Sequence, residues 1–83
     1  MNTSALEQSA ARARAVLAAN LRSARAYRGL KQEQLGALVG LHRTYIGGLE
    51  RGERNASIET LAKLAVALGC EVHELMDPNF MLR

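Results

Sequence analysis

The sequence has few aromatic residues, although nearly half of it is hydrophobic. Its 83 residues include two tyrosines, one phenylalanine and no tryptophan, while hydrophobic residues make up 48%. A core must therefore be built mainly from Leu, Val, Ile and Ala, which suits packed helices. The length allows one domain with a thin core, so pairing with a second copy of the chain would add stability.

The chain also lacks the groups on which several functional classes depend. Its single cysteine, Cys70, excludes an intrachain disulfide and leads us to expect a cytoplasmic protein. No apolar run reaches the roughly 20 residues of a membrane span, and the N-terminus lacks a signal peptide's apolar stretch. Cys70 and His73 make at most half a metal site, and no activated nucleophile or phosphate loop is visible. We therefore expect no enzyme activity, no metal, no cofactor and no small-molecule effector.

Charge is unevenly distributed along the sequence. The formal net charge is +3, which is modest. Residues 22–55 hold seven basic and three acidic side chains, whereas residues 56–82 hold one basic and four acidic side chains. One end of the molecule is therefore positive, and we expect a polyanion to bind there.

Glycine, capping residues and apolar spacing divide the chain into five expected helices, with no convincing strand. Glycine follows each of the first four helices, Ser57 is placed as an N-cap, and Pro78 ends the fifth. The expected helices cover residues 10–28, 32–39, 43–51, 58–68 and 72–76. The fourth carries an apolar stripe that we assign to the core: Ile58, Leu61, Ala62, Leu64, Ala65 and Leu68.

These elements predict an all-α domain over residues 10–78. Residues 1–9 would form a flexible or frayed extension of the first helix. Residues 79–83 would form an apolar tail that packs against some other surface.

The segment from Gln32 to Arg51 has the pattern of two helices joined by a sharp turn. Leu35 and Val39 share one face of the first helix, and Ile46 and Leu49 share one face of the second. Gly40 can take the positive φ that the turn demands. Gly36 lies inside a helix at a cost of about 1 kcal/mol relative to alanine, which indicates that the helix beginning at Arg43 crosses too closely there for a side chain.

These features resemble the Cro/cI-type helix-turn-helix regulators, which include phage repressors, over residues 21–76. The stretches Leu30–Leu35 and Tyr45–Gly52 carry the resemblance. The run from Arg43 to Arg51, followed by Arg54 and Asn55, is similar to the controller proteins of restriction–modification systems.

The resemblance implies a five-helix fold in which the helix beginning at Arg43 enters the major groove of DNA. Its first residues, His42, Arg43 and Thr44, would contact base edges, with Arg43 gripping guanine. Phosphate contacts are expected from Gln32, Tyr45, Arg51, Arg54 and Asn55. By the same resemblance Arg54 could also reach a base, and Arg25 and Glu50 would form an internal salt bridge.

Four positions depart from the family pattern. Lys31 and His42 stand at N-cap positions where Ser or Thr is usual, which predicts weaker caps. Gly47 and Gly48 lie in the middle of the recognition helix. They either let the helix approach DNA closely, which places Gly48 among the base contacts, or shift specificity toward DNA shape.

The resulting hypothesis is a homodimer that binds a pseudo-palindromic operator and blocks or recruits RNA polymerase. Control of a restriction–modification locus is the setting favoured by the resemblance, with a phage-type repressor or antitoxin-like regulator as the nearest alternative. A protein-interaction adaptor that kept the fold without DNA binding is the alternative from another class. The dimer surface is assigned to the end of the chain: Val72, Leu75, Met76 and Phe80.

Overall fold

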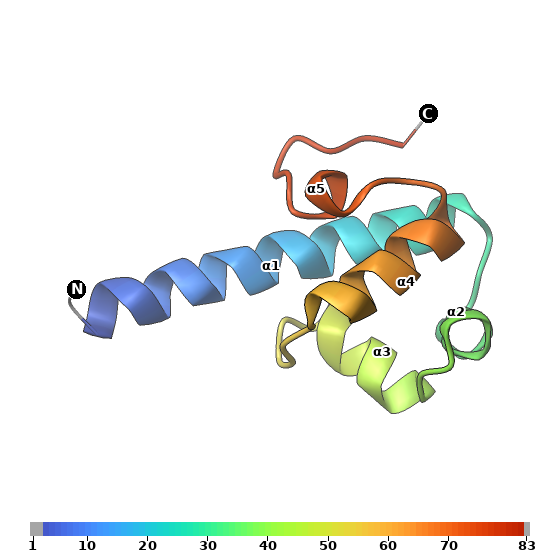
Figure 1. The fold of residues 1–83 in the computed structure, drawn as a ribbon, viewed down its shortest axis with the longest axis horizontal. Coiled ribbons are helices and arrows are strands. Elements are labelled where there is room, and N and C mark those ends of the chain that lie inside the picture. The colour runs from blue at the N-terminus through green and yellow to red at the C-terminus, as the bar shows by residue number, and fades with distance from the viewer. Residues whose placement is uncertain (1–2, 83) are drawn as a thin grey trace.

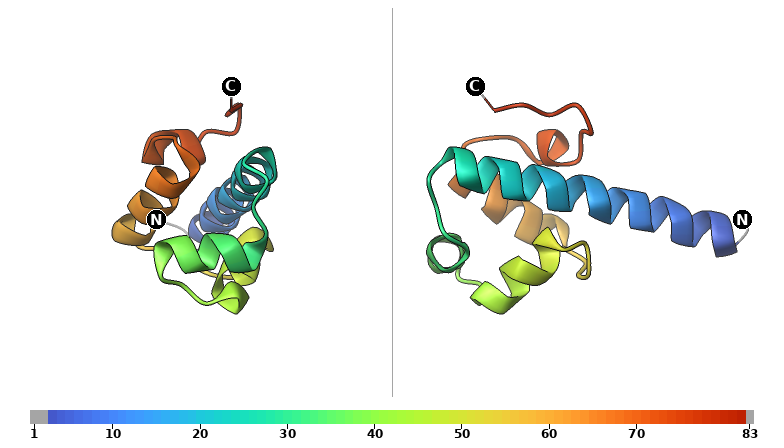
Figure 2. Two further views of the ribbon diagram at one scale, coloured as in Figure 1. Left: turned by 90° about the vertical axis from the view of Figure 1, so that its right-hand side faces the viewer. Right: turned by 180° about the vertical axis from the view of Figure 1, so that it is seen from behind.

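A computed structural model describes residues 3–82 as five helices with no strand among them. Figures 1 and 2 show α1 on one side of the molecule and α4 on the other, with α2 and α3 at one end. The expected all-α, five-helix architecture is confirmed. The helices are α1 (Thr3–Tyr27), α2 (Gln32–Val39), α3 (Arg43–Glu50), α4 (Ile58–Leu68) and α5 (Val72–Leu75).

Helix α1 begins seven residues earlier than its apolar pattern indicates. It starts at Thr3, and the side chains of residues 3–9 are all exposed. Residues 10–19 are rich in alanine, which has the highest helix propensity, and Leu6, Glu7 and Gln8 are also good helix formers, so the helix can continue outward without tertiary contacts. This part of α1 therefore projects from the rest of the molecule (Figure 1), whose longest dimension is 40 Å. Residues 1, 2 and 83 lie outside the described residues.

The core lies where the second half of α1 meets the other helices. Leu21, Leu35, Ile46, Leu49 and Leu64 are all buried to 1% exposure or less, so every long helix contributes to one cluster. Aliphatic side chains make up this cluster, as the shortage of aromatic residues predicts.

The apolar stripe of α4 belongs to the core, with one exception. Leu61, Leu64, Ala65 and Leu68 are buried, and Ala62 is half-buried. Ile58 is 70% exposed, so its assignment to the core is wrong. Ile58 is the first residue of the helix, and it stands on the side that faces solvent.

The C-terminal segment is fastened to α1 by a buried polar residue. The side-chain amide of Asn20 donates to the carbonyl oxygens of Leu75 at 2.9 Å and Asp77 at 2.8 Å. Leu75 is fully buried in the monomer core, so its assignment to a dimer surface is wrong. Val72, Met76 and Phe80 are half-buried and pack against the same core.

Candidate nucleic-acid interface

The turn between α2 and α3 depends on two glycines. Gly40 has a φ of +72°, and the next amide, of Leu41, donates to the Gly36 carbonyl at 2.9 Å. A Cβ at Gly36 would lie 2.4 Å from the backbone oxygen of Leu41, a distance that a side chain cannot occupy. The close approach expected at Gly36 is therefore present, but the group nearest to it is the Leu41 carbonyl of the turn and not the body of α3.

The first turn of α3 is capped by the side chain of His42. The Thr44 amide donates to Nδ1 of His42 at 3.0 Å, and the Thr44 hydroxyl contacts the same nitrogen. The prediction of a weak cap at His42 is therefore wrong, because an imidazole nitrogen can accept as a Ser or Thr oxygen does. At α2, Lys31 has no acceptor in its side chain. There the Lys31 amide donates to Oε1 of Gln34 at 2.8 Å.

Glu50, the last residue of α3, is the centre of a buried polar network. Its carboxylate accepts from Nε of Arg25 at 2.6 Å, from Nη2 of Arg25 at 2.9 Å and from Nε2 of Gln32 at 3.0 Å. Glu50 is only 3% exposed, and its hydrogen bonds raise the pKa of Arg25. The ion pair implied by the resemblance is present. It fixes the end of α3 against α1 and the start of α2, and it holds the Gln32 amide in place.

Gly47 and Gly48 are buried, although they lie in the middle of α3. A Cβ at Gly48 would lie 2.6 Å from Cγ of Arg54, and a Cβ at Gly47 would lie 3.0 Å from Nη1 of Arg51. The two glycines thus form a notch, here called the glycine notch, that is covered by these two arginine side chains. Gly48 is covered by the Arg54 side chain in this arrangement, and its expected base contact stays a prediction.

The loop after α3 is tied to the recognition helix and to α1. The Tyr45 hydroxyl donates to the Asn55 carbonyl at 2.5 Å, and Nη1 of Arg14 donates to Oδ1 of Asn55 at 3.3 Å. Tyr45 is half-buried and also packs on the core. Arg14 was not singled out in the sequence, because only the fold brings residue 14 next to residue 55.

Arg43, at the start of α3, and Arg51, just after its end, expose their charges. Arg43 is 66% exposed and lies 3.6 Å from Glu33, while Arg51 is 60% exposed and lies 3.0 Å from Glu53. Exposed pairs of this kind contribute about 0–1 kcal/mol, so they compete only weakly with a phosphate or a base.

Three other arginines of the basic half have internal partners. Arg22 donates to the Glu50 carbonyl, Arg25 donates to the Leu30 carbonyl at 2.8 Å, and Arg28 donates to the Leu68 carbonyl at 2.8 Å. A carbonyl oxygen is neutral, so Arg22 and Arg28 keep their charge, but part of each guanidinium is held by an internal partner. The exposed cations near the α2–α3 unit that are not held by a carbonyl in this way are Lys31, Arg43, Arg51 and Arg54.

Comparison with known proteins identifies this unit. The helix-turn-helix family profile matches residues 21–75, about two-thirds of the chain. The chain belongs to the helix-turn-helix family. In helix-turn-helix proteins the second helix of the motif is the one placed in the major groove, and here that helix is α3.

Relatives of this helix-turn-helix chain include control proteins. It is 52% identical over 61 residues to control protein C.SmaI of Serratia marcescens, covering 74% of this chain and 73% of that protein. It is 44% identical over 48 residues to control protein C.BamHI of Bacillus amyloliquefaciens, covering 58% of this chain and 59% of that protein.

Two solved structures have the same fold. The restriction-modification controller protein C.AhdI of Aeromonas hydrophila has a TM-score of 0.72 at 47% identity, covering 75% of this chain and 94% of that one. The hypothetical transcription factor NHTF from Neisseria has a TM-score of 0.77 at 40% identity, covering 81% and 77%. The predicted resemblance to controller proteins is confirmed.

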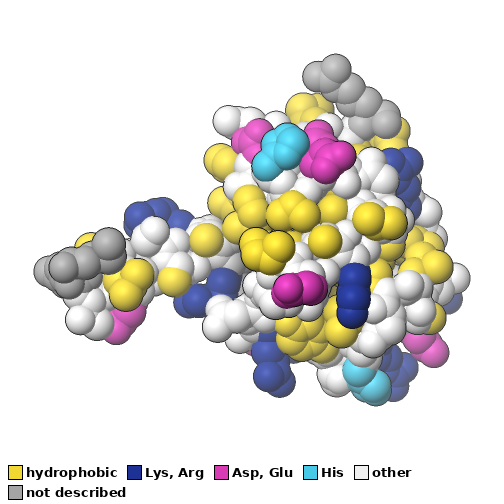
Figure 3. Space-filling model, in the orientation of Figure 1, with side chains coloured by type: hydrophobic (Ala, Val, Ile, Leu, Met, Phe, Trp, Pro, Cys, Tyr) yellow, Lys and Arg dark blue, Asp and Glu magenta, His cyan; other side chains and the backbone are white. Residues whose placement is uncertain are grey.

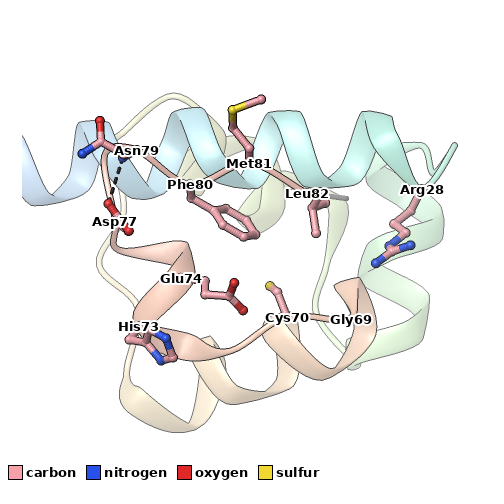
Figure 4. Close-up of a pocket in the computed structure, with 10 residues that line it drawn as sticks. All are labelled: Arg28, Gly69, Cys70, His73, Glu74, Asp77, Asn79, Phe80, Met81 and Leu82. Carbon is pink, nitrogen blue, oxygen red and sulfur yellow. Dashed lines mark hydrogen bonds between the residues drawn. The ribbon is translucent and has the colours of Figure 1, made fainter.

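A cavity of about 650 Å³ lies on the side of the molecule opposite α2 and α3, between α5 and the C-terminal tail (Figure 1). Figure 4 shows the Phe80 ring, the Cys70 sulfur and the Glu74 carboxylate pointing toward its centre. Burial, followed by the nearby Glu74 charge, raises the pKa of the Cys70 thiol. Within residues 3–82 no three His, Cys, Asp or Glu side chains are grouped to hold a metal, and none of the helices could cross a membrane.

Proposed function

We propose that this protein is a sequence-specific DNA-binding regulator of transcription that controls a restriction–modification locus. The observation that carries the proposal is the exposed edge of α3, where Arg43 and Thr44 stand at the open end of a helix held rigidly by Glu50. A rigid recognition helix with polar side chains at its N-terminus can reach base edges in the major groove without rearrangement. The likeness to control proteins supports the restriction–modification setting.

The proposed contacts fall into two groups. Arg43 and Thr44 contact base edges, and His42 does so with the part of its ring that does not cap α3. Arg54 contacts a base from its position over Gly48. Gln32, Tyr45, Arg51 and Asn55 contact phosphates and set the register of α3 on the duplex. We further propose that the protein acts as a homodimer on a pseudo-palindromic operator, with recognition helices about 34 Å apart. Bound protein then blocks or recruits RNA polymerase.

The first test is a gel shift with the DNA immediately upstream of the protein's own gene. Wild type should give a discrete complex that resists excess random DNA. Arg43→Ala should bind at least about tenfold more weakly, because a bidentate arginine–guanine contact is worth about 1–3 kcal/mol of discrimination. Arg12→Ala removes the same charge from the exposed part of α1 and should bind as wild type does.

Two results would count against the proposal. If that fragment is not bound, a selection from genomic fragments shows whether any other site is preferred. If the selection enriches no sequence, sequence-specific regulation is excluded and the adaptor alternative gains support.

A further inference from the structure

One basic side chain beside the candidate interface comes from outside the helix-turn-helix. Arg14 lies on α1, whereas the segment matched by the family profile begins at residue 21. Nη1 of Arg14 donates to Oδ1 of Asn55 at 3.3 Å, and a Cβ at Gly52 would lie 3.8 Å from the backbone oxygen of Arg14. Arg14 therefore lies against the loop that follows α3, the loop that supplies the proposed DNA contacts Arg54 and Asn55.

The charge of Arg14 has no opposite charge beside it. Arg14 takes part in no ion pair among the described residues, whereas Arg43 and Arg51 each lie near a glutamate. Its hydrogen-bond partner is the neutral amide oxygen of Asn55, at a distance longer than the usual length of about 2.9–3.0 Å for an N–H···O bond. A guanidinium has five N–H donors, so most of its donors are left for another acceptor.

The same bond orients the side chain of Asn55. Because Oδ1 of Asn55 accepts from Arg14, the Nδ2 group of Asn55 is left to donate, and nothing within residues 3–82 accepts from it. A phosphate only accepts hydrogen bonds, so an asparagine turned the other way would present an oxygen to it and repel it. Arg14 and Asn55 together therefore offer donors to an anion.

A third donor lies at the same place. Arg14, Arg54 and Asn55 all line one hollow of about 320 Å³ between α1 and the loop. Figure 3 shows basic side chains on the projecting helix and along the lower edge of the molecule, which is where Figure 1 has α3. The three side chains supply two positive charges and an amide donor, which is the chemistry that binds a phosphate of the DNA backbone.

We propose that Arg14 binds a phosphate of the DNA backbone together with Asn55. Helix α1 thereby becomes a third element of the DNA interface, beside the start of α2 and the unit formed by α3 and its loop. The inference rests on the proposed function, because it needs DNA on the α3 side of the molecule. It goes beyond the family resemblance, since the matched segment does not extend to residue 14.

Arg12 is the matched control for Arg14. It carries the same charge on the same exposed part of α1. Two residues correspond to about 200° of rotation around a helix axis, so Arg12 lies on the far side of α1 from Asn55. Any effect that comes only from the net charge of α1 should therefore be the same for Arg12→Ala and Arg14→Ala.

The test measures binding of these variants to two duplexes, the fragment upstream of the gene and random-sequence DNA of the same length. Arg14→Ala should bind both at least about tenfold more weakly and by similar factors, because a phosphate contact carries no sequence information. Its plot of the logarithm of the binding constant against the logarithm of salt concentration should be shallower by about one for each bound subunit. Arg12→Ala should match wild type in affinity and in salt slope.

Two further variants separate a phosphate contact from mere support of the loop. Arg14→Lys keeps the charge and should keep the salt slope, but it should recover only part of the affinity, because lysine lacks the planar fork that can hold Asn55 and a phosphate together. Arg14→Ala combined with Asn55→Ala should lose less than the sum of the two losses, because the two side chains share one phosphate. Thermal melting checks that each variant is folded.

Two results would overturn the assignment. Weaker binding of Arg14→Ala with the wild-type salt slope would mean that Arg14 only supports the loop. Additive losses at positions 14 and 55 would mean that the two side chains do not share a phosphate.

Failure of this inference and failure of the proposed function give different results. If the upstream fragment is preferred over random DNA but Arg14→Ala binds both as wild type does, sequence-specific binding stands and the Arg14 contact fails. If no sequence is preferred but Arg14→Ala still binds random DNA more weakly and with a shallower slope, the Arg14 contact stands and sequence-specific regulation fails. A wild type that binds neither duplex would overturn the Arg14 contact as well.

Discussion

At the scale of single residues, the glycine notch determines how the recognition surface is composed. Glycine in a helix costs about 1 kcal/mol relative to alanine, so two in the eight residues of α3 are expensive for stability. What they allow is the passage of Arg51 and Arg54 across the helix, since any Cβ at Gly48 would meet the Arg54 side chain. Gly48 is therefore a positioning residue for Arg54 in the proposed complex.

Gly48→Ala should lower operator preference by about 1–3 kcal/mol, the value of one bidentate base contact, while leaving the protein as stable or more stable. In an Arg54→Ala background the same change should have no further effect on binding. The double-mutant cycle is measured by gel shift and the stability by thermal melting. Gly47→Ala is the comparison variant: its Cβ would lie 3.0 Å from Nη1 of Arg51 and 3.5 Å from Oε1 of Gln32, away from Arg54, so any loss that it causes should persist in the Arg54→Ala background. Additive losses at positions 48 and 54 would show that Gly48 acts independently of Arg54.

The buried carboxylate of Glu50 makes the opposite kind of contribution. Glu50→Ala should cost about 3–5 kcal/mol of unfolding free energy, because Arg25 and Gln32 lose their partner. Glu53→Ala also removes a carboxylate that pairs with an arginine, but in an exposed pair, and should cost about 0–1 kcal/mol. Urea denaturation of the two variants gives the comparison. Equal effects would mean that burial does not set the strength of the Glu50 network.

At the scale of helices, local sequence signals predict limits well where a cap exists and poorly where one does not. The glycine after each of the first four helices marks its end, and Ser57 marks the start of α4, where its hydroxyl accepts from the Thr60 amide at 3.1 Å. The start of α1 has no such signal. Apolar periodicity begins only where the helix meets the core, so it places the first residue near Ala10 although the helix continues outward to Thr3.

Contacts between helices that are distant in sequence explain the remaining differences. Asn20 looks like a surface residue in sequence, yet it fastens α1 to the end of α5. Arg22 and Arg28 look like free positive charge, yet each donates to a carbonyl at the end of another helix. Such partners are separated by 28 to 57 residues and leave no local pattern.

Asn20→Ala should therefore destabilise the protein by about 1–3 kcal/mol, the cost of leaving buried carbonyl groups without a donor. The effect should be concentrated in α5 and the tail, where amide hydrogen exchange should accelerate more than in α3. Asn79→Ala is a suitable control, because only the backbone amide of Asn79 is seen to bond, to the Asp77 carboxylate. Uniform acceleration throughout the chain would show that Asn20 supports the whole core and not one segment.

At the scale of the whole molecule, the distribution of free charge sets how binding depends on salt. Four exposed cations remain near the α2–α3 unit once the internally bonded arginines are set aside, so a dimer presents about eight. The logarithm of the operator binding constant should fall against the logarithm of salt concentration with a slope of about −7 from these eight if all of them meet phosphates or bases. Fluorescence anisotropy at salt concentrations from about 50 to about 300 mM measures the slope.

Arg28→Ala offers the matched control for this prediction. Arg28 belongs to the basic half of the sequence, but its guanidinium caps the end of α4. Its removal should leave the slope unchanged, whereas Arg51→Ala in both subunits should make it shallower by about two. A shallower slope for Arg28→Ala would mean that the internal carbonyl partner does not withhold this charge from DNA.

The position of Arg54 in a loop also affects how the operator specificity of such a regulator can evolve. Inside α3, Ile46, Leu49 and Glu50 are committed to the core, so substitutions there endanger folding before they alter recognition. Arg54 belongs to an exposed loop, and its replacement leaves the core intact. New operator preferences can thus arise by single substitutions in that loop without passing through an unstable ancestor. Divergence of specificity between related regulators should accordingly be found in the loop and at the exposed first residues of α3, Arg43 and Thr44, before it is found at the buried positions of that helix.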